Sequence, residues 1–129
     1  MPHALIIDDS STTRMYYRDV LESAGFVVDE AINGIEGLEK TMTSGFDLFL
    51  VDLNMPKMDG YTFLDQLRRA GELQAVPAIM ISTQNRASDQ TRAYAAGANV
   101  YLVKPVAPDA LARYCRVLTG QAATPRIAS

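Results

Sequence analysis

The sequence predicts an α/β fold in which parallel strands form one doubly wound sheet with helices on both faces. Short apolar segments alternate along the whole chain with longer segments of helical spacing. Strict alternation of this kind is typical of parallel strands joined by right-handed crossovers. The segments "ALII" and "FDLFLV" are almost continuously apolar, which is expected of strands covered on both faces.

The apolar segments have the length and the composition of strands. The first and third are followed by an acid, and the last is followed by a lysine. In chain order, we expect strands at residues 4–7, 26–31, 46–51, 77–82 and 100–103.

The segments between and after these strands carry helical spacing, and most of them end at a glycine. In the first, an apolar face is formed by Thr13, Tyr17, Val20, Leu21 and Ala24. The last helix is expected to start at a proline, which suits a first helical turn. The predicted helices cover residues 11–24, 34–44, 60–70, 87–96 and 108–118.

The chain length of 129 residues corresponds to one ordinary domain. We expect this domain to cover residues 1–120. Residues 121–129, "QAATPRIAS", are small and polar and show no periodicity. They are predicted to form a short flexible tail.

The charge of the chain argues against binding to nucleic acid, and its short apolar runs argue against membrane insertion. The formal net charge is −3 and the pI is near 5.0, so no basic patch is available for phosphate backbones. No apolar run reaches the length of a membrane span. The apolar stretch within the N-terminal segment "MPHALIIDD" is too short for a signal peptide. A single cysteine, Cys115, cannot form an internal disulfide. We therefore expect a soluble, cytoplasmic protein.

Polar residues gather where the predicted strands end. The first strand is followed by Asp8 and Asp9, the third by Asp52, and the last by Lys104, while the fourth ends at Ser82. In open α/β sheets, ligands bind beyond the carboxyl ends of the strands, where the strand order reverses. If the strand order is 2-1-3-4-5, the first and third strands are neighbours, and the three carboxylates converge.

Three neighbouring carboxylates repel one another, and a hard cation relieves the repulsion. A few oxygen ligands with room for water suit Mg²⁺, which commonly shares its coordination shell with a phosphate. Lys104 and Ser82 add an ammonium and a hydroxyl beside the metal, which is the set of groups that a transferring phosphoryl group needs. Asp52 is then the candidate nucleophile, while Asp8 and Asp9 are better suited to hold the metal.

Four fragments in order, "IIDDSSTTR", "VDLNMPKMDG", "IMIST" and "YLVKP", give the chain a family resemblance. Over residues 3–118 it resembles response-regulator receiver domains, and most of all the single-domain, CheY-like chemotaxis type. The resemblance implies a flavodoxin-like (βα)5 fold with strand order 2-1-3-4-5. It also implies a two-component signalling protein that accepts a phosphoryl group from a histidine kinase or phosphotransfer protein, and that is not otherwise an enzyme.

The resemblance assigns the metal and phosphoryl ligands. Asp52 would be the phosphoacceptor. Mg²⁺, with Mn²⁺ as a substitute, would be held by Asp8, Asp9, Asp52 and the backbone carbonyl of Asn54. Lys104 would bind the phosphoryl oxygens.

Further positions would form the switch of such a domain. Ser82 would bond the phosphoryl group and draw its loop inward, and Tyr101 would move toward the space that Ser82 leaves. Pro105 would follow a cis peptide bond. The target-binding face would be the helix at 87–96, the strand at 100–103 and the last helix, with the side chains Tyr94, Tyr101, Val106 and Arg113 to Arg116.

Some positions depart from the family pattern. Val106 is smaller than the aromatic residue often found after Lys-Pro, and Thr83 is bulkier than the common Ala or Gly. Asn54 and Gln84 are neutral amides at the two positions that tune attack by water. Neither can act as a general base, so we expect no strong acceleration of phosphoryl hydrolysis.

Other readings stay open at this point. Asp9 could instead cap the first helix. An aspartyl phosphatase would need a second Asp at position 54, and a nucleotide binder would need a phosphate loop after the first strand. An unphosphorylated scaffold is a further alternative.

The exposed pair Met15 and Tyr16 could dock the kinase, or Tyr16 could only pack across the last helix. The target could be a flagellar motor, a phosphorelay partner or a kinase, or the domain could be a phosphate sink.

Overall fold

The computed structural model describes residues 1–121, and the predicted tail lies outside the described residues apart from Gln121. Its five strands form a single parallel sheet in the order β2-β1-β3-β4-β5, as the sequence predicts. The strands are β1 (His3–Ile7), β2 (Val27–Ala31), β3 (Leu48–Asp52), β4 (Ala78–Ser82) and β5 (Val100–Val103). β3 therefore lies at the centre of the sheet, between β1 and β4.

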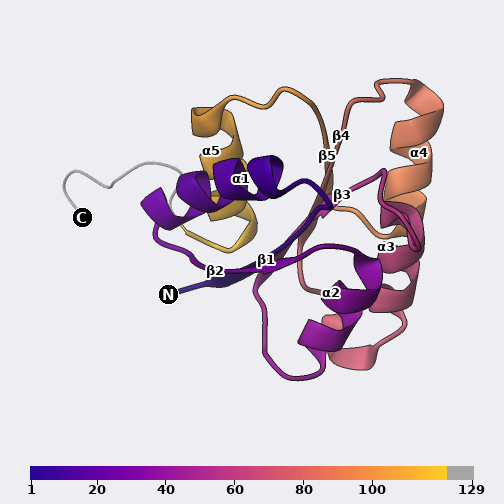
Figure 1. The fold of residues 1–129 in the computed structure, drawn as a ribbon, viewed down its shortest axis with the longest axis horizontal. Coiled ribbons are helices and arrows are strands. Elements are labelled where there is room, and N and C mark those ends of the chain that lie inside the picture. Colours follow the sequence, from indigo (N-terminus) through magenta and orange to yellow (C-terminus); the bar gives the residue numbers. More distant parts are fainter. Residues whose placement is uncertain (122–129) are drawn as a thin grey trace.

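Helices cover both faces of the sheet (Figure 1). α1 packs against α5 on one face, and α3 packs against α2 and α4 on the other. The helices are α1 (Ser11–Ser23), α2 (Gly34–Thr41), α3 (Gly60–Arg68), α4 (Ala87–Ala96) and α5 (Pro108–Leu118), and a short 3-10 helix covers Gly71–Leu73.

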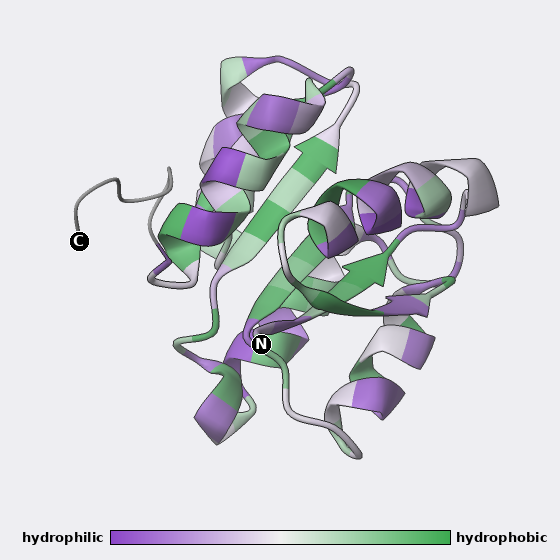
Figure 2. Ribbon diagram, turned by 90° about the vertical axis from the view of Figure 1, so that its left-hand side faces the viewer, coloured by the Kyte–Doolittle hydropathy of each residue, from purple (hydrophilic) through white to green (hydrophobic). Residues whose placement is uncertain are grey.

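Each face of the sheet has its own apolar core, because successive residues of a strand point to opposite faces. One core joins Leu5, Phe49 and Phe63 to the α2, α3 and α4 side, and the other joins Leu21 and Ile79 to the α1 and α5 side. Figure 2 shows the apolar strands between helices of mixed polarity. All residues of β3 and β4 are buried, as expected of central strands.

Cys115 lies on the inner side of α5, where it is fully buried. Burial raises the pKa of its thiol to about 12. The residue therefore acts as a small apolar core residue. Among the described residues, no helix is long and apolar enough to cross a lipid bilayer.

The helices differ in how they begin. Ser10, Asn33 and Asp59 cap α1, α2 and α3, each by accepting a backbone N–H three residues further on. α4 and α5 follow Arg86 and Ala107, which make no capping bond through their side chains. The two α-helices without a side-chain cap are thus α4, which follows the loop after β4, and α5, which follows the loop after β5.

Two predicted helix ends were wrong. α2 ends at Thr41 and not at residue 44, because the hydroxyls of Thr41 and Thr43 bond the carbonyls of Leu38 and Lys40, and the chain leaves the helix. α3 ends at Arg68, before the 3-10 turn that starts at Gly71. The end of the first helix agrees with the prediction within one residue, and Gly25 follows it with a left-handed φ of 94°.

Candidate functional site

The carboxyl ends of β1 and β3 bring three acids together. Asp8 directly follows β1, and Asp52 is the last residue of β3, its neighbour in the sheet. Carboxylate oxygens of Asp8, Asp9 and Asp52 lie within 4.8 Å of one another. Asp8 and Asp52 are buried, with 1% and 7% of their surface exposed, whereas Asp9 is exposed. The predicted convergence of the three carboxylates is therefore present in the structure.

Burial and mutual repulsion change the acidity of these groups. The pKa of Asp52 is raised to about 6, mainly by burial and next by the neighbouring charge of Asp8. The pKa of Asp8 is also raised, again mainly by burial, against the lowering effects of the Ser10 N–H and Lys104. The site therefore carries more negative charge than its own protein groups neutralise.

Lys104 directly follows β5, and its side chain extends into the acidic cluster. Its Nζ atom lies 3.2 Å from Asp52 Oδ1 and 3.7 Å from Asp8 Oδ2. The backbone N–H of Lys104 donates to the Ser82 carbonyl at 2.8 Å, which continues the pairing of β4 with β5. The peptide bond between Lys104 and Pro105 is cis.

One oxygen of Asp8 indicates what the site can hold. Asp8 Oδ1 accepts the backbone N–H of Ser10 at 2.8 Å, but the buried Asp8 Oδ2 has no hydrogen-bond partner among the described residues. A buried carboxylate oxygen without a hydrogen bond is costly, and a cation bound there removes the cost. Three carboxylates with all-oxygen donors fit a hard divalent ion such as Mg²⁺.

Two hydroxyl residues, Ser82 of β4 and Tyr101 of β5, both bond to Gln84 in the loop after β4. Ser82 is buried at the end of β4, next to the strand that carries Asp52, and its Oγ accepts the N–H of Gln84 at 3.1 Å. The Tyr101 hydroxyl donates to the Gln84 carbonyl at 2.6 Å, and only 8% of the residue is exposed. Tyr101 is therefore turned inward against the loop after β4, while Thr83 in that loop is exposed.

Gly60, the first residue of α3, lies directly against the backbone of Asp52. Its N–H donates to the Leu53 carbonyl at 2.9 Å. A Cβ atom at Gly60 would lie 2.6 Å from the Asp52 carbonyl oxygen, closer than real Cβ contacts allow. The glycine thus lets α3 start against the end of β3, and the loop that contains the exposed Asn54 spans the gap between them.

The contact of Arg14 with the backbone of the acidic cluster was not predicted from the sequence. The Arg14 guanidinium donates to the Asp8 backbone carbonyl at 2.7 Å and to Glu30 at 2.8 Å. Arg18 donates to the second oxygen of Glu30 at 2.6 Å, so α1 is tied to the end of β2. The spacing of the two arginines by one helical turn was a usable signal, but nothing in the sequence paired them with Glu30.

The N-terminal half of α1 bears on two points that the sequence left open. Ser10 and not Asp9 caps this helix. The Tyr16 hydroxyl donates to the Val106 carbonyl at 2.7 Å, so Tyr16 reaches across to the loop before α5. Met15 is 63% exposed beside it. Docking of a kinase on this pair of residues stays a prediction.

Comparison with known proteins identifies the family. The model of the response regulator receiver domain matches residues 4–116. The chain belongs to this family. It is therefore a receiver domain of the two-component signalling type, and the acidic cluster occupies the edge of the sheet at which the sequence predicted the site.

Several relatives of this receiver domain act in signalling. The sensor histidine kinase CheAY of Helicobacter pylori is 40% identical over 103 residues, which are 78% of this chain and 13% of that protein. The chain spans less than half the length of the curated relatives it matches here.

Solved structures show the same fold. The chemotaxis protein CheY4 of Vibrio cholerae is 31% identical, with a TM-score of 0.87 over 92% of this chain and 98% of that one. The receiver domain of the sensor histidine kinase PA1611 from Pseudomonas aeruginosa is 25% identical, with a TM-score of 0.85 over 93% and 98% of the two chains. That structure has a magnesium ion coordinated in its active-site cleft.

Proposed function

We propose that this receiver domain accepts a phosphoryl group on Asp52 and signals by phosphorylation-dependent protein binding. The observation that carries the proposal is the buried Asp52 carboxylate, which faces Asp8, Asp9 and the Lys104 ammonium at the central edge of the sheet. These are the charges that a transferring phosphoryl group and its metal require.

In the proposed reaction, an Asp52 oxygen attacks the phosphorus of a phosphohistidine on a sensor kinase or phosphotransfer protein. The new P–O bond forms as the P–N bond breaks, and the leaving imidazole takes up a proton from water. Lys104 and Ser82 bind the phosphoryl oxygens, which replaces the ion pair that Lys104 now makes with Asp52. Phosphorylation turns the Asp52 carboxylate, of charge −1, into an acyl phosphate of about −1.5 to −2, and this added charge redistributes these contacts.

Asp8, Asp9, Asp52 and the Asn54 backbone carbonyl are proposed to hold Mg²⁺, which neutralises the phosphoryl charge when bound. The buried Asp8 Oδ2, which has no hydrogen-bond partner among the described residues, supports this ligand set. Mn²⁺ accepts the same oxygen ligands and is expected to substitute. Hydrolysis of the aspartyl phosphate by the domain itself is part of the same proposal.

The output face is proposed to be α4, β5 and α5, which present the exposed side chains Tyr94, Val103, Tyr114 and Val117. Coupling would run through Ser82 and the inward Tyr101, both bonded to Gln84. We expect the partner to be a protein and not nucleic acid or a membrane, given the net charge of −3. We expect the reaction in the cytoplasm, where a lone thiol stays reduced.

The test uses acetyl phosphate and Mg²⁺ with intact-mass spectrometry. The unaltered chain is expected to gain about 80 Da, the mass of HPO₃, and Asp52→Asn to gain none. An adduct of equal yield in both proteins would contradict the assignment of Asp52. Capture of a target by the phosphorylated chain, but not by Asp52→Asn, would then test the output proposal.

A further inference from the structure

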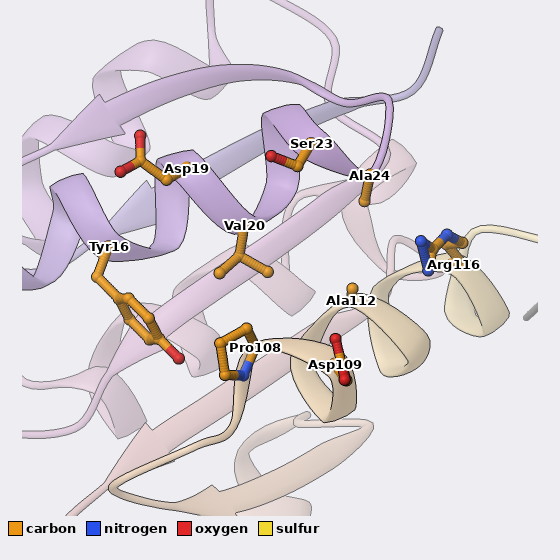
Figure 3. Close-up of a pocket in the computed structure, with 9 residues that line it drawn as sticks. All are labelled: Tyr16, Asp19, Val20, Ser23, Ala24, Pro108, Asp109, Ala112 and Arg116. Atoms are coloured by element: carbon orange, nitrogen blue, oxygen red, sulfur yellow. The ribbon is translucent and has the colours of Figure 1, made fainter.

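A hydrogen bond connects α1 to the loop that carries Lys104. The Tyr16 hydroxyl donates to the Val106 carbonyl at 2.7 Å, and Val106 lies two residues after Lys104. Figure 3 shows the Tyr16 side chain extending from α1 toward Pro108, where α5 begins. The bond thus joins two segments that are 90 residues apart in the sequence.

The loop between β5 and α5 has few other attachments. At its start, the Lys104 N–H donates to the Ser82 carbonyl. At its end, α5 begins after Ala107 without a side-chain cap. Within residues 1–121, the hydrogen bond that reaches residues 105–107 from outside the loop and α5 is the one from Tyr16. A single side chain therefore holds the middle of the loop by hydrogen bonding.

Tyr16 lines two cavities. One, of about 380 Å³, lies between α1 and α5 and is also lined by Val20 and Pro108. The other, of about 280 Å³, is also lined by Lys104 and Val106, so it borders the loop between β5 and α5. Val106 is half-buried and packs against the core on the α1 and α5 side. On its cavity side the loop makes fewer packing contacts, so the Tyr16 bond adds to a limited amount of packing.

We propose that Tyr16 is a positioning residue for phosphoryl transfer, which fixes this loop so that the Lys104 ammonium stays in place beside Asp52. The inference rests on the proposed function of Asp52 as the phosphoacceptor. An ammonium stabilises the charge of a transferring phosphoryl group only if it is already correctly placed, because reorganisation during the reaction raises the barrier. Tyr16 acts through Lys104, whose Nζ atom is 3.2 Å from Asp52 Oδ1.

Tyr16→Phe tests the proposal, because it keeps the ring and removes the donor. Phosphorylation by acetyl phosphate, a donor with no protein surface, separates positioning from kinase docking. At saturating Mg²⁺ we expect the rate constant to fall about fivefold, the effect of one net hydrogen bond. The Mg²⁺ concentration for half-maximal binding is expected to stay unchanged, since the proposed metal ligands lie outside this loop.

Tyr61→Phe is the matched control. It removes a hydroxyl that donates to the Asp89 carbonyl at 3.3 Å, between α3 and α4 on the opposite face of the sheet. Its phosphorylation rate should equal that of the unaltered chain. An equal loss of rate in both variants would mean a general effect on stability and would overturn the role of Tyr16.

A double-mutant cycle tests whether Tyr16 acts through Lys104. In a Lys104→Ala background, Tyr16→Phe should cause no further loss of rate, because the group that it positions is gone. A loss as large as in the unaltered background would overturn the proposal.

The failure of the two proposals can be told apart. No phosphorylation of the unaltered chain would overturn the proposed function, and with it any role of Tyr16 in transfer. Normal phosphorylation of both the unaltered chain and Tyr16→Phe would overturn only the inference about Tyr16. Amide hydrogen exchange at Val106 and Ala107, measured without a phosphodonor, should be faster in Tyr16→Phe, and unchanged exchange would also overturn the inference.

Discussion

The Lys104 ammonium lies closer to Asp52 than to Asp8, at 3.2 Å against 3.7 Å. One cation therefore faces two buried carboxylates, with the Asp9 carboxylate next to them. Although Lys104 lowers the pKa of Asp52, burial and Asp8 raise it more, so that it reaches about 6. The metal-free site is consequently a place where the folded chain carries unfavourable charge.

Removal of one of these charges should stabilise the metal-free protein. Asp52→Asn keeps the shape of the side chain and removes a charge that is buried beside Asp8. At about pH 7.5, in buffer that contains a chelator, we expect the free energy of unfolding of Asp52→Asn to exceed that of the unaltered chain by about 1 to 3 kcal/mol. Urea denaturation followed by circular dichroism measures it. Asp47→Asn, at the residue before β3, is the control, because an asparagine oxygen can still accept the His3 N–H. A destabilised Asp52→Asn protein would contradict the expectation.

The difference in unfolding free energy between Asp52→Asn and the unaltered chain should depend on pH in a defined direction. The pKa of Asp52 is raised from 3.8 to about 6 on folding, so the folded state binds this proton more tightly than the unfolded state. Its stabilising contribution is complete below about pH 4 and is lost as the pH rises through about 6. The advantage of Asp52→Asn should therefore be small at the acid end and constant above about pH 7. A difference that shrinks as the pH rises would have the wrong sign.

Mg²⁺ should stabilise the unaltered chain, and Asp8 should be needed for most of this effect. The buried Asp8 Oδ2 has no hydrogen-bond partner among residues 1–121, and a bound cation supplies one. At about 100 times its Kd, the ion should add about 2.7 kcal/mol to the unaltered chain. Asp8→Asn should lose most of this gain. Thermal denaturation with and without Mg²⁺ measures both, and an equal shift in the two proteins would exclude Asp8 as a ligand.

The contact between Gly60 and Asp52 predicts the effect of a single methyl group. Gly60→Ala would place Cβ 2.6 Å from the Asp52 carbonyl oxygen, so α3 has to move away from the end of β3. We expect a loss of about 1 to 3 kcal/mol in unfolding free energy. Gly45→Ala is the matched control, because nothing lies within 4 Å of its added Cβ. Equal stability of the two variants would contradict the packing that the structure shows.

The lifetime of the phosphorylated state should be long, because no base lies at the positions that would activate water. Asn54 is exposed and neutral, and the amide Gln84 is held through its backbone by Ser82 and Tyr101. Without a phosphatase, we expect the aspartyl phosphate to persist for well over about a second. Loss of the mass adduct after removal of acetyl phosphate gives the lifetime. Decay within about a second would show that another group activates the water.

The sequence predicted the parts of the structure that depend on periodicity and on chain direction. Alternating strands and helices determine a parallel sheet, and a parallel sheet brings all strand ends to one edge. Together with the strand order 2-1-3-4-5, which the family resemblance implied, this predicts the meeting of Asp8, Asp52 and Lys104 that is present in the structure. The strand order 2-1-3-4-5 is likewise confirmed.

Features that depend on individual side chains were not predicted. The bond from Tyr16 to Val106 and the pairing of Arg14 with Glu30 join residues whose distance in space depends on crossover geometry and rotamers. Periodicity carries no information about either. The end of α2 was misplaced for a related reason, since local hydroxyl bonds at Thr41 and Thr43 ended the helix before the glycine.

The uneven capping of the helices has a consequence for where the domain can change shape at low energetic cost. Displacing the first turn of α1, α2 or α3 breaks a side-chain cap, at a cost of about 1 kcal/mol each. The first turns of α4 and α5 carry no such penalty, and they directly follow the loops of Ser82 and Lys104. The two α-helices that begin without a side-chain cap are thus the two adjoining the groups proposed to bind phosphate. A new charge on Asp52 could therefore shift the starts of α4 and α5 without breaking a capping bond.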